Sequence, residues 1–542
     1  MSTIAILLSA FLLSVIALLV FVWSQRRGLL DRDSGSAEVI FANGEIGRIE
    51  DPSASALDRV SLQQQVTQAG TVPRPRSTPA AELQQRARAD AAVAPVVLFF
   101  FCSALVWLLV GSAAGLVSSI KLHAPDWLTT EAWLTFGRLR TIHLNAVAYG
   151  WVAMAGLGIA MFVLPRLLKT ELAGARFAMF GGALWNLALL GGLCAIAGGW
   201  NEGLEWLEIP WQFGTLFALG GALVGVPLML TLLRRRVDHL YVSVWYMGAA
   251  LFWFPVLYVV AKIPGLHRGV EQATMNWWFG HNVLGLFFTP LALASIYYFL
   301  PKVIGRPVQS YNLSLLGFWT LAFFYGQAGG HHLVGGPVPA WLVTLSIVQS
   351  MMMLVPVVAF TVNQYGTLKG HMKALLYSPT LRFVGLGGIL YMLSSVQGSF
   401  EALRSINVVT HFTHFTVAHA HLGLYGFVTL VFFGSMYFIV PRITGREWPS
   451  RVLIMAHFWL VSAGLVVYFV SLTIGGWLQG LAMLDASRPF MESVKLTLPW
   501  LEWRSVGGSL MVLGHLVFVG HFLLLLASRA PRGGRATLLH AV

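Results

Sequence analysis

The feature that most constrains the fold is a series of hydrophobic runs, each long enough to cross a lipid bilayer. A membrane-spanning helix needs about 20 apolar residues, and such runs recur along the whole chain. Backbone groups in lipid must be hydrogen-bonded within the segment, so each run is expected to be an α-helix. One isolated run is followed by a block of twelve, and the thirteen runs cover residues 3–23, 94–119, 142–165, 175–198, 211–233, 241–262, 277–300, 310–328, 339–363, 381–398, 417–441, 452–475 and 506–528.

The composition agrees with an all-α polytopic membrane protein. Of the 542 residues, 57% are hydrophobic and 11% are charged, whereas a soluble domain carries roughly 25% charged residues. With the amino terminus outside, the basic loops all fall on the cytoplasmic side, as in an inner membrane protein. These loops are residues 234–238, 301–307, 367–373, 441–451 and 528–535, while the acidic loop 201–208 falls outside. The net charge of +13 therefore reflects topology, and nucleic acid is not an expected partner.

Four regions are predicted along the chain. Residues 1–23 form a retained transmembrane anchor, because no basic residue precedes the first run and Arg26 and Arg27 follow it directly. Residues 24–93, rich in Gln, Ala, Pro and Arg, are predicted to be a partly disordered cytoplasmic linker. A twelve-helix core covers 94–530, and residues 531–542 form a cytoplasmic tail.

The two cysteines, Cys102 and Cys194, lie in separate hydrophobic runs and are interpreted as small core residues. The sequence contains no CxxCH motif, so the chain attaches no c-type haem itself.

Six histidines lie in or beside the hydrophobic runs, where ionisable groups are costly and mark functional sites by default. They are His143, His281, His331, His332, His419 and His421. For any one of them, an interfacial position or a hydrogen bond to a backbone carbonyl is a plain alternative. Six histidines in four separate places favour metal ligation.

The spacing of the histidines indicates how they divide between metals. His419 and His421 point about 200° apart on a helix, so they cannot hold one metal together and instead suit two cofactors flanking that helix. The adjacent pair His331 and His332 lies beside glycines, and the topology puts His281 at the same depth. Three imidazoles at one depth suit copper.

His143 and His421 on facing helices would give a haem with two axial imidazoles, suited to electron transfer. His419 would then be the lone ligand of a second haem with a free face toward the copper. Arg138 and Arg140 precede His143 and are expected to pair with haem propionates; ordinary interfacial arginines are the alternative.

Five blocks of sequence, in order, resemble the haem–copper oxygen reductase superfamily, and specifically the catalytic subunit of cbb3-type cytochrome c oxidases. The blocks are "FGRLRTIHLNAV", "WWFGHN", "YYFLPKVIGRPVQSYNLS", "YGQAGGHHL" and "HFTHFTVAHAHLGLYGFV". The resemblance covers roughly residues 94–530 and includes the twelve-helix fold.

The resemblance implies a role for each histidine. His281, His331 and His332 would hold the active-site copper, His419 would ligate the high-spin haem b3, and His143 with His421 would ligate the low-spin haem b. Tyr325 matches the family's redox tyrosine, which is covalently joined to the histidine corresponding to His281 and supplies an electron and a proton. In isolation Tyr325 would be interpreted as a packed aromatic residue.

The resemblance also implies a proton path and an outer acidic site. Four hydroxyl residues fall where the family places its proton-input path, although such hydroxyls often bond back to their own helix; they are Thr289, Tyr311, Ser314 and Tyr391. Glu205 and Glu208 match acidic residues near the haem propionates, where calcium binds; a solvated acidic loop is the alternative.

Several positions depart from the family pattern. Gln397 stands where a glutamate near the high-spin haem is expected, Gly317 replaces a histidine, and His414 replaces an aspartate. The N-terminal anchor is not part of the usual catalytic subunit. It faintly resembles the small single-span assembly protein encoded with these oxidases; a plain extra anchor is the alternative.

The predicted function is that of a terminal respiratory oxidase that reduces O2 to water, coupled to proton uptake. An electron-donating partner subunit with c-type haem or copper is expected. The alternative within the superfamily is nitric oxide reductase, which Tyr325 disfavours. A haem-based gas sensor or assembly protein would not need the copper ligands, and a transporter would need paired broken helices.

Overall fold

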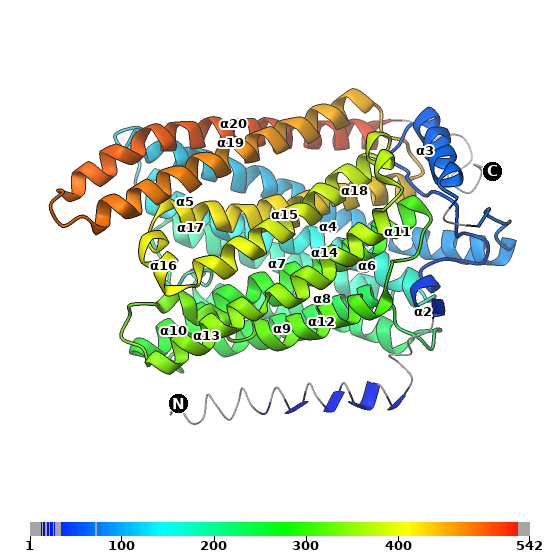
Figure 1. Ribbon diagram of the computed structural model, residues 1–542, viewed down its shortest axis with the longest axis horizontal. Coiled ribbons are helices and arrows are strands. Elements are labelled where there is room, and N and C mark those ends of the chain that lie inside the picture. The colour runs from blue at the N-terminus through cyan, green and yellow to red at the C-terminus, as the bar shows by residue number, and fades with distance from the viewer. Residues whose placement is uncertain are drawn as a thin grey trace.

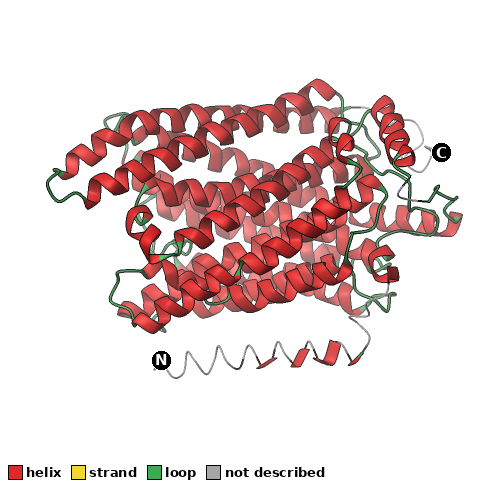
Figure 2. Ribbon diagram, viewed as in Figure 1, coloured by secondary structure: helices red, strands yellow, loops and turns green. Residues whose placement is uncertain are grey.

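The computed structural model describes residues 34–70 and 73–528, together with isolated positions between 12 and 27. The described residues form helices and loops, with no strand among them (Figure 2). Eleven helices in the described part are long and apolar enough to cross a membrane. The prediction of an all-α polytopic membrane protein is confirmed. The first predicted span, residues 3–23, lies largely outside the described residues.

The helices follow one another as α-helices with short 3₁₀ or π segments between them. In chain order they are α2 (Ser34–Glu38), α3 (Ala56–Gln68), α4 (Ala80–Lys121), η1 (Ala132–Leu134), α5 (Phe136–Asn145), η2 (Ala146–Val152), α6 (Ala153–Leu167), α7 (Ala175–Ala197), α8 (Trp211–Leu233), α9 (Val242–Lys262), α10 (Gly269–Val283), η3 (Leu284–Phe288), α11 (Thr289–Ile304), α12 (Tyr311–Tyr325), η4 (Ala328–Leu333), α13 (Ala340–Met352), α14 (Leu354–Leu368), η5 (Met372–Leu376), α15 (Pro379–Glu401), α16 (Arg404–Thr410), α17 (His414–His421), η6 (Leu422–Thr429), α18 (Leu430–Thr444), α19 (Arg451–Leu484) and α20 (Phe490–Ala527).

Each of the twelve predicted core spans coincides with one of these helices or with two or three consecutive ones. The predicted span that is not among the eleven long apolar helices, at 310–328, is α12. Its 15 residues extend about 22 Å at 1.5 Å per residue, less than the hydrocarbon thickness of about 30 Å. α4 begins at Ala80, well before the apolar run at 94. Its first turns are rich in Ala, Glu, Gln and Arg, which are strong helix formers but carry no hydrophobic signal.

Three long helical segments form the centre of the bundle. Phe136–Leu167, Val270–Ile304 and His414–Thr444 are 94, 89 and 83% buried over their most apolar windows, whereas the other spans are 33–50% buried. The three central segments are therefore surrounded by protein, and the outer helices face lipid.

The central segments share a common plan. Each changes to a π-helix, at η2, η3 and η6, one to three residues after His143, His281 and His421 respectively. Such π turns are rare and occur mostly at functional sites. Each segment then continues as an α-helix to a proline followed by a cation: Pro165–Arg166, Pro301–Lys302 and Pro441–Arg442.

The three cations converge on the carboxylate of Glu50, which belongs to the N-terminal segment (residues 34–70). Glu50 lies 3.6 Å from Arg166, 3.1 Å from Lys302 and 2.8 Å from Arg442. Burial alone would raise the pKa of Glu50, but the three cations lower it to about 2. α2 and α3 therefore lie at the end of the bundle opposite to α5, α10 and α17, which carry histidines (Figure 1).

Asp51, beside Glu50, fixes the same segment to the start of α15. Its carboxylate accepts hydrogen bonds from Thr380 at 2.9 Å, from Ser53 at 2.5 Å and from Ser378. The packed residues 34–70 differ from the predicted partly disordered linker. Buried carboxylates paired with cations and hydroxyls anchor these residues, and the polar sequence carries no signal of such contacts.

Candidate metal centre

Three of the predicted histidines form a cluster at the end of the bundle opposite the N-terminal segment. His281 comes from α10, and His331 with His332 comes from the 3₁₀ turn η4. Each offers a ring nitrogen, and these nitrogens lie within 4.8 Å of one another. This is the only group of three or more metal-binding side chains found in the part of the chain that the structure describes. The donor set suits copper.

Two neighbours that the sequence analysis did not single out orient this triad. The Ser350 hydroxyl lies 2.9 Å from Nδ1 of His331, so Nε2 is the nitrogen left for a metal. The indole of Trp277 stacks on His332, with ring centroids 4.0 Å apart and planes at 12°. Such contacts behind a ligand fix its tautomer and orientation. Nothing in the amino-acid sequence indicates that Ser350, which lies on α13, would contact His331.

Tyr325 lies beside the triad, as predicted. It is the last residue of α12, and its ring centroid is 4.6 Å from that of His281, with planes at 26°. Gly285, one turn after His281, makes this approach possible, because a Cβ there would overlap the tyrosine ring.

His143 and His421 face each other across a narrow space. Their ring centroids are 6.2 Å apart and their planes differ by 9°. The Nδ1 atoms lie 2.8 Å and 2.9 Å from the carbonyls of Gly111 and Val417, which directs each Nε2 away from its own backbone. Since a metal–imidazole bond is about 2.0–2.1 Å long, one ion fits between the two rings. Tyr468 Oη lies 3.2 Å from Nε2 of His421, at the edge of this space.

His419 lies on the same helix as His421 and points to a different side. Its Nδ1 has no hydrogen-bond partner among the described residues. Gly398 of α15 lies against its ring, and a Cβ there would come 2.7 Å from Cε1 of His419. The buried Oε1 of Gln397, the neighbouring residue, is likewise unpaired within the described part of the chain. His414 begins the helix, with its backbone N–H donating to Gln479 at 3.0 Å.

The predicted outer residues are tied into a loop between α7 and α8. Arg140 pairs with Glu205 through two hydrogen bonds of 2.6 and 3.2 Å, and Arg138 donates to the carbonyl of Ala197 at 2.9 Å. Glu208 accepts a 2.9 Å hydrogen bond from Asn145 on one oxygen. Burial raises the pKa of Glu208 to about 7, and its second oxygen meets no hydrogen-bond donor in the described residues.

This loop is also fastened to the helix that carries His281. Asn276 of α10 exchanges hydrogen bonds with the backbone of Glu205, at 3.2 Å to its N–H and 2.7 Å to its carbonyl. The link between the acidic loop and α10 was not predicted, since an asparagine on a helix gives no sequence signal of its partner.

No hydrogen bond between side chains joins the four predicted proton-path residues in the described part of the chain. The Tyr311 hydroxyl donates to the carbonyl of Leu240 at 2.8 Å, and Ser314 bonds back to its own helix, at Tyr311, at 2.6 Å. The buried Tyr391 hydroxyl has no partner within residues 34–70 and 73–528. Thr289 is the first residue of α11.

Buried aromatic side chains fill part of the space between these residues. Tyr246 stacks on Tyr297 with centroids 5.9 Å apart, and Phe360 packs edge-on against both Tyr297 and Tyr391 at 5.6 and 5.1 Å. The Tyr246 hydroxyl lies 3.5 Å from where a Cβ on Gly317 would stand. A tyrosine hydroxyl therefore lies beside the position where a histidine was expected.

A family model described as cytochrome C and quinol oxidase polypeptide I matches residues 95–510. The chain belongs to this family. A similar relative is the cbb3-type cytochrome c oxidase subunit CcoN1 of Stutzerimonas stutzeri, 33% identical over 438 residues, which cover 78% of this chain and 92% of that one. Cytochrome c oxidase subunit 1 of Rhodobacter capsulatus is 31% identical over 76% of this chain and 81% of its own length.

Two more distant matches cover similar lengths of the chain. A nitric oxide reductase subunit of Stutzerimonas stutzeri is 23% identical over 78% of this chain and 93% of its own length. A solved haem-copper terminal oxidase dimer shares the fold, with a TM-score of 0.68, 18% identity, and coverage of 82% of this chain and 86% of that one. The chain is thus the membrane-embedded catalytic subunit of a haem–copper terminal oxidase, which reduces O2 to water with proton uptake.

Proposed function

We propose that this oxidase subunit is of the cbb3 type and that its six histidines hold three metals. His281, His331 and His332 hold copper, His419 ligates high-spin haem b3, and His143 with His421 ligates low-spin haem b. The observation that carries the proposal is the three-imidazole cluster within 4.8 Å with the Tyr325 ring beside it. The 33% identity to a cbb3-type subunit over most of the chain supports the subtype.

When bound, the haems and copper supply the electron transfer and the oxygen chemistry. The chain supplies ligands, orientation and protons. Ser350 and Trp277 hold His331 and His332 so that their free nitrogens converge. Tyr325 holds a transferable proton on its hydroxyl oxygen, next to His281, and its ring can be oxidised there by one electron.

Protons are proposed to reach Tyr325 from the end of the bundle that carries α2 and α3. Tyr311 and Ser314 lie at the start of α12, and Thr289 and Tyr391 lie further along the bundle. The Tyr391 hydroxyl, unpartnered among the described residues, supports a role for this residue as an intermediate proton carrier. Tyr246 and Tyr297 add hydroxyls to the same route.

At the other end, Arg138 and Arg140 are proposed to meet the haem propionates. Glu205 and Glu208 are proposed to bind calcium nearby. The buried oxygen of Glu208 that accepts no hydrogen bond from the described residues supports this, although Arg140 already occupies both oxygens of Glu205.

The proposed setting is a bacterial cytoplasmic membrane with the amino terminus outside and the carboxyl terminus inside. The sequence lacks a motif for attaching c-type haem, which supports a separate electron-donating subunit that carries c-type haem or copper. The N-terminal span is proposed to be an added anchor or a fused assembly segment.

Nitric oxide reduction is the second candidate. Gln397, Gly317 and His414 depart from the oxidase pattern, and a nitric oxide reductase subunit matches 78% of the chain. Tyr325 beside the copper ligands favours oxygen instead.

The test compares oxygen and nitric oxide turnover by the purified protein. Tyr325→Phe keeps the ring but loses the phenolic proton, so oxygen turnover is expected to be abolished. The control is Tyr437→Phe, a buried tyrosine whose hydroxyl lies 3.0 Å from His457 rather than at the triad. Normal oxygen consumption by Tyr325→Phe, or nitric oxide as the faster substrate of the parent protein, would overturn the proposal.

A further inference from the structure

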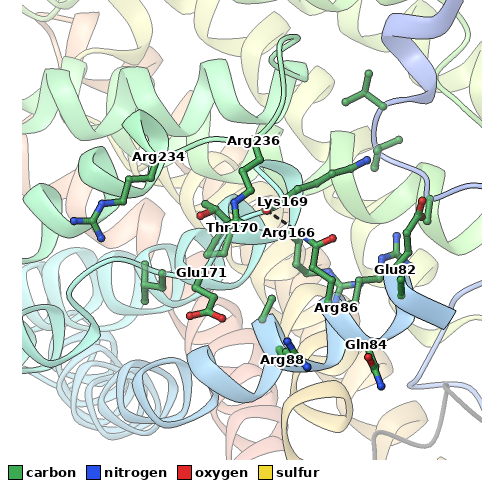
Figure 3. Close-up of a pocket in the computed structure, with 18 of the residues that line it drawn as sticks. Glu82, Gln84, Arg86, Arg88, Arg166, Lys169, Thr170, Glu171, Arg234 and Arg236 are labelled. Carbon is green, nitrogen blue, oxygen red and sulfur yellow. Dashed lines mark hydrogen bonds between the residues drawn. The ribbon is translucent and has the colours of Figure 1, made fainter. Parts of the chain in front are cut away.

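A cavity of about 860 Å³ opens at the end of the bundle that carries the N-terminal segment. Its walls come from residues 39–42, the first turns of α4, the end of α6, the loop before α7 and the loop after α8 (Figure 3). None of the histidines or other predicted site residues lines it. The cavity is therefore separate from the metal centre, and the oxidase function does not account for it.

The lining of the cavity is strongly basic. It contains six cations and two carboxylates: Arg86, Arg88, Arg166, Lys169, Arg234, Arg236, Glu82 and Glu171. Arg86 pairs with Glu45, and Arg166 pairs with Asp90 through hydrogen bonds of 2.5 and 2.8 Å.

The other four cations have no carboxylate within salt-bridge distance in the part of the chain that the structure describes; they are Arg88, Lys169, Arg234 and Arg236. Figure 3 shows Arg236 near Lys169 and Arg166, whereas Arg234 extends away from them. Within the described residues, the side chains beside Arg166 thus carry positive charge without a protein counter-ion.

Arg166 also lines this cavity, and the carboxylates of Asp90 and Glu50 hold its guanidinium group. The Arg166 side chain is only 4% exposed, and its closest ionic contact through Nη2 is Glu50 at 3.6 Å. Nη2 makes no hydrogen bond among the described residues. Guanidinium groups offer paired donors that match phosphate oxygens, so the arginines that line this cavity without a salt bridge to the described residues, Arg88, Arg234 and Arg236, suit a phosphate group.

Apolar surface begins at the rim of the same cavity. Gly174, one of its lining residues, lies where a Cβ would contact Phe177 and Pro227 at 3.6 Å. Phe177 on α7 is 65% exposed and Leu233, directly before Arg234, is 69% exposed. Both lie at the ends of membrane spans. Their exposed faces therefore suit acyl chains, which a soluble anion does not have.

We propose that this cavity binds the phosphate headgroup of an anionic phospholipid, whose acyl chains lie along α7 and α8. Basic pockets between membrane helices on the cytoplasmic side bind such headgroups. The N-terminal segment forms one wall through residues 39–42, which lie outside the residues matched by the family model. The N-terminal segment thus adds one wall to a site whose cations Arg166, Lys169, Arg234 and Arg236 belong to the oxidase core.

The experiment is a binding titration on the purified full chain in detergent, followed by native mass spectrometry. The probes are phosphatidylglycerol, phosphatidylcholine and inorganic phosphate. A Lys or Arg near the surface is worth about fivefold in affinity for anionic lipid, so Arg236→Gln is expected to weaken phosphatidylglycerol binding about fivefold. The double variant Lys169→Gln with Arg236→Gln is expected to weaken it about 30-fold, by the same reasoning applied twice.

Arg235→Gln is the matched control, because it lies in the same loop and is exposed but does not line the cavity. It is expected to bind phosphatidylglycerol as the parent protein does. Helical circular dichroism confirms that each variant is folded.

Three results from the variants and the two lipids would overturn the proposal. They are equal losses in Arg235→Gln and Arg236→Gln, unchanged binding in the double variant, or phosphatidylcholine binding as tightly as phosphatidylglycerol. Displacement of phosphatidylglycerol by inorganic phosphate at equal concentration would also contradict it, since the acyl chains would then contribute nothing.

Discussion

Three glycines give the rings of the candidate centre the space they occupy. Gly115 lies against His143, Gly285 against Tyr325 and Gly398 against His419, and in each case a Cβ would come within 2.7 Å of the ring. At the residue scale, the positions of these three rings thus depend on small side chains on neighbouring helices.

Gly285→Ala is expected to push the Tyr325 ring away from His281. Overpacking of this kind costs about 1–3 kcal/mol of stability, and oxygen turnover is expected to fall while the low-spin haem spectrum is kept. Thermal unfolding and turnover measure the two effects. Gly225→Ala, where a Cβ meets nothing within 4 Å, is the control; an equal loss there would show that the effect is not specific to Tyr325.

His332→Ala removes one imidazole of the triad and the stacking partner of Trp277. Copper content is expected to fall, whereas the spectrum of the haem held by His143 and His421 stays unchanged. Elemental analysis and absorption spectra measure both. His457→Phe, which removes a buried histidine surrounded by aromatic rings, controls for general damage. Normal copper in His332→Ala would exclude it as a ligand.

The three central helical segments place groups at fixed positions relative to one another, which single residues cannot do. In each, a π turn follows a histidine and a cation lies near the end of the helix. The histidines proposed as metal ligands and the Glu50 cluster therefore lie at opposite ends of the same three elements. Glu50 of the N-terminal segment contacts all three helices at one end, and Glu45 of the same segment also contacts Lys302.

Glu50→Gln is expected to lower the unfolding temperature at neutral pH, because three buried cations lose their shared counter-charge; breaking a buried pair costs about 3–5 kcal/mol. The lowered pKa of Glu50, about 2, means that its contribution is present above the ordinary glutamate pKa and is lost as pH falls toward 2. The difference between variant and parent should therefore shrink as the pH is lowered from about 5 to about 3.

Glu447→Gln is the matched control for this prediction. Glu447 also contacts the N-terminal segment, pairing with Arg59 at 3.0 Å, but its side chain is 53% exposed. Exposed pairs contribute about 0–1 kcal/mol, so little change is expected. A Glu50→Gln variant as stable as Glu447→Gln at neutral pH would contradict the account of the cluster.

Across the whole molecule, the hydrophobic runs and the histidine spacing were sufficient to predict the fold and to predict which imidazoles lie close together. The runs predict membrane helices because lipid imposes one solution on the backbone. His281, His331 and His332 were placed together because topology and adjacency restrict them to one depth. Ser350, Trp277 and Asn276 could not be predicted, since their partners are distant in sequence and their types are common in any helix.

The packing of the N-terminal segment, by contrast, could not be predicted from the hydrophobic pattern. Its packing depends on Glu50 and Asp51, whose partners Lys302, Arg442 and Thr380 lie hundreds of residues away. The polar composition of this segment suggested disorder, because a hydropathy pattern reports only the apolar surface that a segment can bury. It does not report the pairing of buried charges.

Metal and haem analysis of the purified protein tests the central claim most directly. Six imidazoles arranged as one facing pair, one single ligand and one triad predict two haems and one copper per chain. A protein that contains iron in place of copper, or only one haem, would contradict the assignment of His281, His331, His332 and His419.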